Sequence, residues 1–284
     1  MTTERYEYEE YKLWRPEMVL YEVKDHIATI TLNRPEVLNA FLSESFEAIT
    51  NYIDEADKDP EVRVLVVTGK GRGFSSGDDV KGMFLAPKEV REARQHERAL
   101  RTLDKGAHNE VATAFMHFGK PSIAMVNGPA VGWGMELALW PDMRIASDRA
   151  RFSELFAVVG LIPSAAGLLL LPHIVGLPKA YEILYTGDFI DAEEALRIGL
   201  VNKVVPHEQL EEETYKFATK IATGAAPVSH KLIKEIVKRG FYGYQEEASE
   251  YIRIGQTLAS QTEDHRNYSL SFAQKKGPIT YKGR

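Results

Sequence analysis

Two glycine-rich turns in the sequence carry the residues best suited to chemistry. In the second turn, Gly132-Trp133-Gly134 follows an apolar run and opens a helix-compatible segment with a single carboxylate, Glu136. The first turn of a helix presents backbone N–H groups that have no intrahelical partner, and these can bind an anionic oxygen. A carboxylate buried beside them is costly unless it has a task. The segment therefore predicts an active site that joins an anion-binding turn to a general acid or base.

The first glycine turn, residues 69–79, follows an apolar and β-branched run at 62–68. Its glycines allow the backbone to approach a ligand closely. Each of the two turns would supply one outward-facing N–H group, and two such donors that converge on one oxygen would form an oxyanion hole. The turn is not a nucleotide-binding P-loop, because it lacks the required order of glycine, lysine and hydroxyl residues.

The same turn also matches the G-x-S-x-G pattern of a serine nucleophile, with Ser75 at its centre. A hydrolase triad would need a downstream acid and histidine, such as Asp188 and His207, and neither has local support in the sequence. The preceding strand also comes earlier in the chain than is usual for such a nucleophile. We therefore place a serine hydrolase below an enzyme with two backbone oxyanion donors.

The elements that must position these turns alternate between strand and helix. Strands are expected at residues 19–23, 28–32, 62–68, 122–126 and 143–146, and a helix capped by Ser43 at 43–56. This alternation implies parallel crossover connections and an α/β core. Further helices are expected at 195–198, 210–223 and 228–240. We predict an N-terminal extension at 1–18, a core at 19–205 and a helical C-terminal region at 206–284.

Composition excludes several classes of protein. The chain has 284 residues and a net charge of −6, which argues against binding to nucleic acid. It contains no cysteine for disulfides or thiolate chemistry, and its eight histidines form no ligand array, so no metal is expected. No apolar run approaches the roughly 20 residues of a membrane span. The acidic, aromatic N-terminus is unlike a leader peptide, so we expect a cytoplasmic protein.

Six motifs in chain order make the sequence resemble the crotonase (enoyl-CoA hydratase/isomerase) family. They lie at residues 32–40, 73–79, 126–130, 134–138, 186–188 and 195–205, within a resemblance that covers about 19–240. The resemblance implies a β-β-α superhelix with a helical trimerisation region, assembled as a homotrimer or a dimer of trimers. It also implies an acyl-coenzyme A thioester as substrate, with coenzyme A as part of that substrate and no separate cofactor.

The resemblance also assigns roles to individual residues. It implies that the oxyanion donors are the backbone N–H groups of Asp78 and Trp133, and that Glu136 is one of the two glutamates of the hydratases. The residues that match the coenzyme A groove are Ser76, Asp78, Asp79, Val80 and Lys81. Two fixed donors would stabilise an enolate-like thioester, while the carboxylate activates water at Cβ or moves a proton at Cα.

Several positions depart from the family pattern. Trp133 stands where the family usually has glycine, and Asp78 replaces a small residue, so its side chain is expected to turn away from the developing anion. The second hydratase glutamate falls on Phe156, which cannot transfer a proton and is expected to line an apolar acyl pocket. Glu154, two residues earlier, is expected at the surface, although an extended backbone at 151–156 would turn it toward the site.

The principal prediction is an enoyl-CoA hydratase, in which Glu136 is the main acid and base for reversible addition of water to a 2-enoyl-CoA thioester. Ser164, where some family members carry another acid, is only a weak proton donor. Because Phe156 replaces the second glutamate, the same fold could instead support enoyl-CoA isomerisation, decarboxylation or C–C bond hydrolysis. A non-catalytic acyl-CoA-binding protein is the third interpretation.

Overall fold

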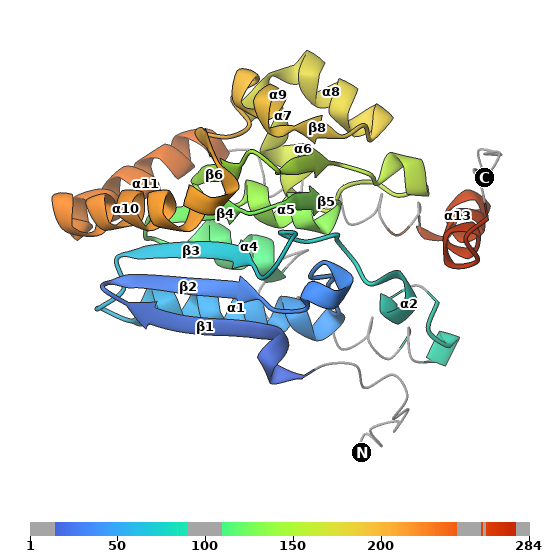
Figure 1. Ribbon diagram of the computed structural model, residues 1–284, viewed down its shortest axis with the longest axis horizontal. Coiled ribbons are helices and arrows are strands. Elements are labelled where there is room, and N and C mark those ends of the chain that lie inside the picture. Colours follow the sequence, from blue (N-terminus) through green and yellow to red (C-terminus); the bar gives the residue numbers. More distant parts are fainter. Residues whose placement is uncertain are drawn as a thin grey trace.

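Six strands form the main sheet, in the order β1-β2-β3-β4-β6-β9 (Figure 1). They are β1 (Val19–Lys24), β2 (Ile27–Leu32), β3 (Val64–Gly69), β4 (Ser122–Val126), β6 (Met143–Ser147) and β9 (Lys203–Val205). The computed structural model describes residues 15–83, 85–89, 92, 110–242, 257 and 260–276. Strands β1 and β2 form an antiparallel hairpin, and the other neighbouring pairs are parallel. The predicted α/β class and its five strands are thus confirmed.

A second, three-stranded sheet has the order β5-β7-β8 and was not predicted from the sequence. Its strands are β5 (Pro129–Val131), β7 (Arg151–Ser153) and β8 (Ile190–Asp191). Segments of two or three residues are too short to show a hydrophobic period of two. This small sheet matters for function, because β5 connects the main sheet directly to the helix that carries Glu136.

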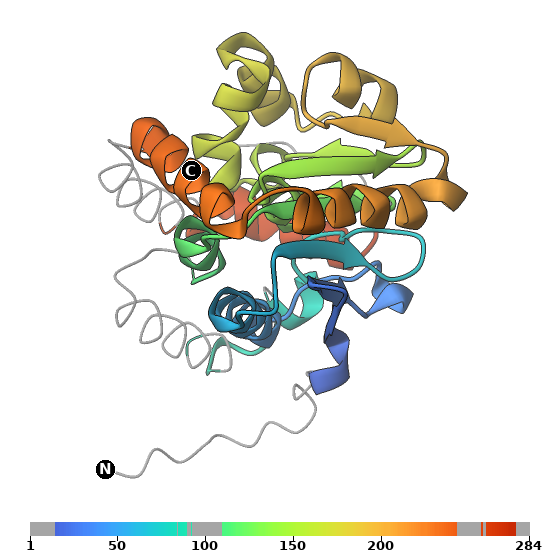
Figure 2. The same ribbon diagram turned by 90° about the vertical axis from the view of Figure 1, so that its left-hand side faces the viewer.

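Helices cover both faces of the main sheet. Alternate residues of β3 point in opposite directions, so Leu65 and Val67 join the core cluster that includes helix α1 (Ser43–Lys58), while Val64 and Val66 join the cluster that includes helix α10 (Leu210–Gly224). Figure 2 shows α1 end-on at one side of β3 and α10 at the other. Because it is covered on both sides, β3 is buried along its whole length, as its apolar run predicts.

The remaining helices are short or lie toward the C-terminus. They are α2 (Val80–Met83), α4 (Glu110–His117), α5 (Trp133–Leu139), α6 (Ala166–Leu169), α7 (Leu171–Val175), α8 (Leu177–Thr186), α9 (Ala192–Arg197), α11 (Pro227–Tyr242) and α13 (Glu263–Ala273), with 3-10 helices η2 (Pro16–Met18), η3 (Pro35–Val37), η4 (Ala157–Val159) and η5 (His207–Gln209). Among the described residues, none of the helices has the length and apolar content that a bilayer span needs.

The structure bears on two predicted boundaries, the start of α1 and the division of the chain into regions. The assignment of Ser43 as a helix cap is wrong, because Leu42 is the N-cap of α1 and the hydroxyl of Ser45 accepts a hydrogen bond from the Leu42 N–H at 3.0 Å. Helix α10, which belongs to the predicted C-terminal region, packs on strands of the main sheet. The structure therefore gives no boundary at residue 205, and that division of the chain stays a prediction. Most of the expected extension at 1–18 lies outside the described residues.

Arg144, on strand β6, ties the end of α5 to the rest of the core. Its side chain is buried, and its guanidinium donates to the carbonyl oxygens of Leu200 at 2.7 Å, Pro141 at 2.9 Å and Leu139 at 3.1 Å. These carbonyls would otherwise be buried without a donor. A charged side chain therefore holds together the C-terminus of the helix that carries Glu136 and the loop before β9.

Replacing this buried arginine should destabilise the fold. In Arg144→Met, the freed carbonyl groups lose their donors, and we expect the free energy of unfolding to fall by about 3 kcal/mol in chemical denaturation. Arg149→Met is the matched control, because Arg149 pairs with Glu208 at the surface. That change should cost less than about 1 kcal/mol. Equal stability of the two variants would contradict this account.

Candidate active site

Asn39 fixes the first glycine turn. Its side chain is buried, and its Nδ2 donates to the carbonyl oxygens of Gly73 at 2.8 Å, Lys70 at 3.0 Å and Phe74 at 3.1 Å. Its Oδ1 accepts a hydrogen bond from the backbone N–H of Arg34 at 2.8 Å. One asparagine thus satisfies carbonyl groups along the whole turn, which holds its backbone in a single conformation.

Two glycines let the first turn and the start of α5 come into backbone contact. A Cβ atom at Gly134 would lie 2.2 Å from the carbonyl oxygen of Ser75, so this position admits only glycine. Gly77 has a φ of 89°, and a Cβ atom there would lie 3.3 Å from the backbone nitrogen of Trp133. The structure therefore brings the backbone just before Asp78 next to the N–H group of Trp133.

Trp133 fits at the start of α5 without backbone strain. Gly132 takes the positive φ of 53°, and Trp133 follows as the first helical residue. Its indole is buried and packs on the ring of Phe46, with 4.7 Å between ring centroids. Phe156 is also buried, with its ring 3.8 Å from the place of a Cβ atom at Gly132. Aromatic side chains therefore pack beside the second turn, whose Gly132 is half-buried.

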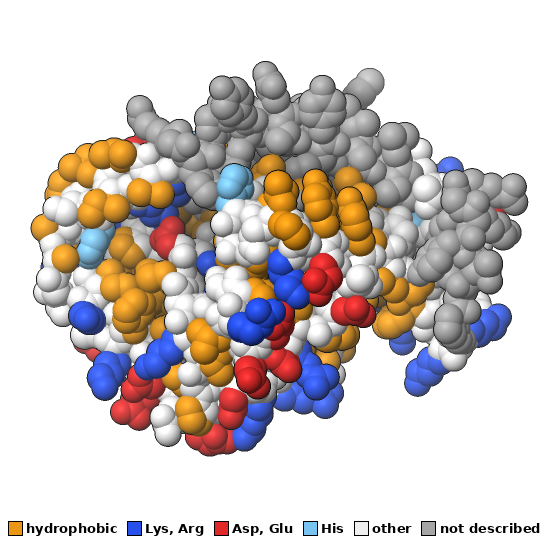
Figure 3. Space-filling view, turned by 90° about the horizontal axis from the view of Figure 1, so that it is seen from above, with side chains coloured by type: hydrophobic (Ala, Val, Ile, Leu, Met, Phe, Trp, Pro, Cys, Tyr) orange, Lys and Arg blue, Asp and Glu red, His pale blue; other side chains and the backbone are white. Residues whose placement is uncertain are grey.

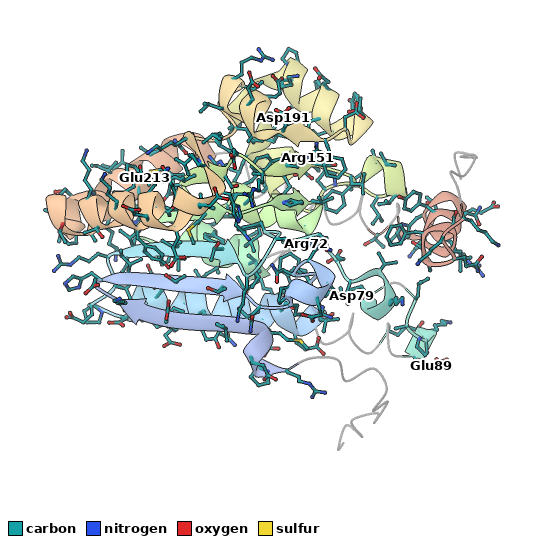
Figure 4. All side chains as sticks on the ribbon, in the orientation of Figure 1. Arg72, Asp79, Glu89, Arg151, Asp191 and Glu213 are labelled. Atoms are coloured by element: carbon teal, nitrogen blue, oxygen red, sulfur yellow. The ribbon has the colours of Figure 1, made fainter. Side chains whose placement is uncertain are left out.

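The residues that match a coenzyme A groove lie together at the start of α2. The Ser76 hydroxyl donates to the carbonyl of Val37 at 3.2 Å. Asp79, labelled in Figure 4, pairs with Arg34 at 3.1 Å and accepts the Gly82 N–H at the first turn of α2. Val80 is half-buried and Lys81 is exposed, while Asp78 is half-buried. Asp79 thus has a structural role, and the role of the whole stretch in binding coenzyme A stays a prediction.

The structure does not assemble the alternative serine triad. Ser75 is fully buried, and its hydroxyl donates to the carbonyl of Asn39 at 2.8 Å while it accepts the N–H of Gly77 at 3.2 Å. His207 is bonded to the hydroxyl of Ser147 at 3.0 Å, and Asp188 is exposed. Ser75 therefore stabilises the turn rather than facing a histidine.

Glu136 is completely buried, one helical turn after Trp133. Its Oε2 accepts the N–H groups of Ala166 at 2.7 Å and Ala165 at 3.1 Å, and its Oε1 accepts that of Gly167 at 2.9 Å. The hydroxyl of Ser164 lies 3.4 Å from Oε2. Burial raises the pKa of Glu136 from 4.5 to about 7, although these donors act in the opposite direction. The group can therefore both accept and release a proton near neutral pH.

The expectation that Glu154 lies at the surface is wrong, because its side chain is fully buried. The backbone is extended in β7, which ends at Ser153, and Glu154 follows with its carboxyl group beside Gly167. Neither of its oxygens has a hydrogen-bond partner among the described residues. Burial and then the charge of Glu136 raise its pKa well above the ordinary value. The structure thus places a second carboxyl group at the site, at a position that the sequence analysis rejected.

Comparison with known proteins agrees with this architecture. A family model described as enoyl-CoA hydratase/isomerase matches residues 22–284. The chain is 34% identical to the trans-2-decenoyl-[acyl-carrier-protein] isomerase of Streptococcus mutans, over 92% of this chain and 96% of that protein. It is 33% identical to the short-chain-enoyl-CoA hydratase of Clostridium acetobutylicum, over 94% and 98%.

Solved structures give the same result for the fold. The structure is similar to an enoyl-CoA hydratase from Mycobacterium avium subsp. paratuberculosis, with a TM-score of 0.80 and 26% identity over 93% of this chain and 99% of that one. It is also similar to an enoyl-CoA hydratase/isomerase from Pseudoalteromonas atlantica, with a TM-score of 0.79 and 27% identity over 93% and 100%. The β-β-α superhelix expected from the sequence is thereby confirmed.

The buried carboxyl of Glu136 should make stability depend on pH. The folded chain keeps this proton up to about pH 7, whereas the unfolded chain releases it near pH 4.5, so its contribution to the free energy of unfolding falls as pH rises between these values. Glu136→Gln removes this titration. Denaturation at about pH 5 and pH 8 should therefore show the variant gaining on the wild type by up to about 3 kcal/mol. A pH-independent difference would contradict the buried ionisation.

Proposed function

This chain belongs to the enoyl-CoA hydratase/isomerase family, and from that membership we propose that it adds water reversibly to a 2-enoyl-CoA thioester. The observation that carries the proposal is Glu136, a fully buried carboxyl group with a pKa near neutrality, one turn into the helix that begins at Trp133. Coenzyme A is part of the substrate, and no separate cofactor takes part.

The backbone N–H groups of Asp78 and Trp133 bind the thioester oxygen in this proposal. They belong to the two turns that meet at Gly77 and Gly134, and Trp133 N–H lies outside the intrahelical hydrogen bonds of α5. Negative charge moves onto the thioester oxygen as the enolate-like state forms. Fixed donors in an apolar site stabilise that state, and each contributes about a hundred- to a thousandfold in rate.

Glu136 transfers the protons. It removes a proton from water while the resulting hydroxide adds to Cβ, and the electron pair of the double bond moves toward the thioester oxygen. The enolate then takes that proton back from Glu136 at Cα, which returns Glu136 to its ionised form. A pKa of about 7 suits both transfers, because the group is neither a very weak base nor a very weak acid at neutral pH.

Isomerisation of the enoyl double bond is the second candidate function. It needs the same oxyanion donors and a base that moves a proton between two carbons, but no water. The aromatic surroundings of the second turn, with Trp133 and Phe156 both buried, favour it. A relative that covers nearly the same length is named as an isomerase. The two reactions are separated by substrate, since only isomerisation converts a 3-enoyl thioester to its 2-enoyl form.

Turnover of crotonyl-CoA tests the proposed function. We expect the wild type to consume it, as followed by loss of the conjugated thioester absorbance, and Glu136→Gln to lower kcat by about a thousandfold without weakening binding of butyryl-CoA. Glu193→Gln, an exposed change on α9, is the control and should have normal kcat. If the wild type converts only 3-enoyl-CoA, the isomerase replaces the hydratase. If Glu136→Gln is fully active, the proposed role of Glu136 is wrong.

We also propose that the chain assembles as a homotrimer or a dimer of trimers. Helix α11 exposes apolar side chains at four-residue spacing on one face, namely Val228, Leu232 and Ile236. Apolar side chains also lie between charged ones on the face seen in Figure 3, and α8, at the top of Figure 1, exposes Leu177, Tyr181 and Tyr185. A monomer rarely leaves such surfaces in water, so a second copy of the chain is the expected cover.

Light scattering after size-exclusion chromatography tests this assembly. The wild type should elute with the mass of three or six chains, and the double variant Leu232→Lys/Ile236→Lys should shift toward the monomer, because charge would be buried in the interface. Leu20→Lys places the same charge at an exposed apolar position on β1 and serves as the control. A monomeric wild type would overturn the proposed assembly.

A further inference from the structure

We propose that Glu154 is the proton partner of Glu136: at rest the pair of buried carboxyl groups holds one proton, on Glu154, which leaves Glu136 as the anion that takes a proton from water and returns it. A protonated Glu154 would then leave Glu136 free to ionise, at a site where Phe156 supplies no second acid. This inference rests on the proposed function and deepens it. Glu154 acts through Glu136 and is therefore a positioning residue.

The two carboxyl groups meet at Gly167. A Cβ atom at this glycine would lie 2.9 Å from Oε1 of Glu136 and equally 2.9 Å from Oε1 of Glu154. The two oxygens are therefore within about 6 Å of each other, on the same side of α6. Any larger residue at this position would collide with both carboxyl groups, so the missing side chain is what leaves room for the pair.

The surroundings of the two carboxyl groups differ sharply. Glu136 accepts three backbone N–H groups, from Ala165, Ala166 and Gly167, whereas neither oxygen of Glu154 has a donor among the described residues. Donors stabilise an anion, and two adjacent buried carboxylates cannot both be ionised without a large cost. The negative charge thus belongs on Glu136 and the proton on Glu154.

The charged groups on the described elements that pack against β7 are exposed or half-buried, namely Asp191 on β8 and Glu193, Glu194 and Arg197 on α9. Helix α5 packs against β4, β5 and α6, and none of these three carries a titratable side chain. Strand β7 carries Arg151, which is exposed and labelled in Figure 4. Helix α13 packs on η4, where His265 bonds to the carbonyl of Val159 at 2.9 Å. The charge that acts on Glu154 is that of Glu136.

The proton count of hydration closes with this pair. At rest the pair holds one proton, on Glu154. Glu136 takes a second proton from water as hydroxide adds to Cβ, and the neutral pair then returns one proton to Cα through Glu136, which leaves the enolate electron pair in the new C–H bond. The pair ends with one proton again, so no acid is needed at Phe156. Catalysis requires Glu136 ionised and Glu154 protonated, which predicts a bell-shaped pH profile.

Kinetics of Glu154→Gln test the role of the pair. We expect kcat for crotonyl-CoA to fall by about a hundredfold with KM changed less than about twofold, and the alkaline limb of the kcat profile to disappear while the acid limb, set by Glu136, remains. Glu154→Asp should recover part of kcat and restore the alkaline limb. Glu193→Gln should leave both the rate and the profile unchanged.

The outcomes separate this inference from the proposed function. If Glu154→Gln has normal kcat and a normal profile while Glu136→Gln is inactive, the inference is overturned and the proposed function stands. If both variants are fully active, the proposed role of Glu136 falls as well. A loss of kcat in Glu154→Gln with both limbs unchanged also overturns the inference, because a purely structural defect gives that result.

Infrared spectroscopy tests the resting proton without relying on activity. At about pH 8, exposed carboxyl groups are ionised, so a remaining carbonyl band of a protonated carboxyl group reports a buried acid. The band should be present in the wild type, absent in Glu154→Gln and retained in Glu136→Gln. Absence of the band from the wild type, or its loss in Glu136→Gln alone, would place the proton elsewhere and contradict the proposal.

Discussion

The backbone contact between the first glycine turn and strand β5 is the constraint on which the site depends. The N–H group of Val131 donates to the carbonyl of Ser75 at 2.9 Å, and the N–H groups of Phe74 and Ser75 both approach the carbonyl of Pro129 at 3.0 Å. These bonds join the turn that follows β3, a central strand of the main sheet, to the segment that leads into α5. Gly134 makes the contact possible, because any side chain there would meet the carbonyl of Ser75. Both proposed oxyanion donors and Glu136 take their places from this one junction.

Burying two carboxyl groups lowers the stability of the fold, and the surrounding backbone stabilises one of them much more than the other. The turn at 164–167 directs three N–H groups to Glu136, which makes an anion tolerable there. Glu154 receives no comparable help among the described residues, so its protonated form is the stable one. An unsatisfied buried acid weakens the fold, and structures that keep such a group commonly use it. The local instability at Glu154 is therefore an argument for function rather than against it.

The features that could be predicted from the sequence are those set by neighbouring residues rather than by contacts between distant parts of the chain. An unbroken β-branched run identified β3, and glycine spacing identified the two turns, because both signals lie within a few residues. The burial of Glu154 could not be read in this way, since it depends on packing beside Gly167, which lies more than ten residues away in the chain. The extended conformation of β7 was the missing fact, and a three-residue strand leaves almost no periodic signal. At the start of α1, Ser45 accepts the Leu42 N–H where Ser43 was expected as the cap, because two serines one residue apart offer more than one way to cap a helix.

Hydration and isomerisation share the enolate-like state that backbone donors stabilise, but they form it differently: hydroxide adds to Cβ in hydration, whereas a base removes a proton from carbon in isomerisation. The roles proposed for the backbone donors and Glu136 are the same in both reactions, so nothing in the junction between the two turns selects one of them. We expect the selection to depend on the aromatic side chains near the second turn, Trp133 and Phe156, and on the room they leave for a water molecule beside Cβ. Most acceptor positions of Glu136 are already taken by N–H groups, so little of the carboxylate remains for water to contact. A fold that fixes its oxyanion donors through the backbone can therefore change its reaction when aromatic side chains are exchanged, because the donors that stabilise the enolate stay in place.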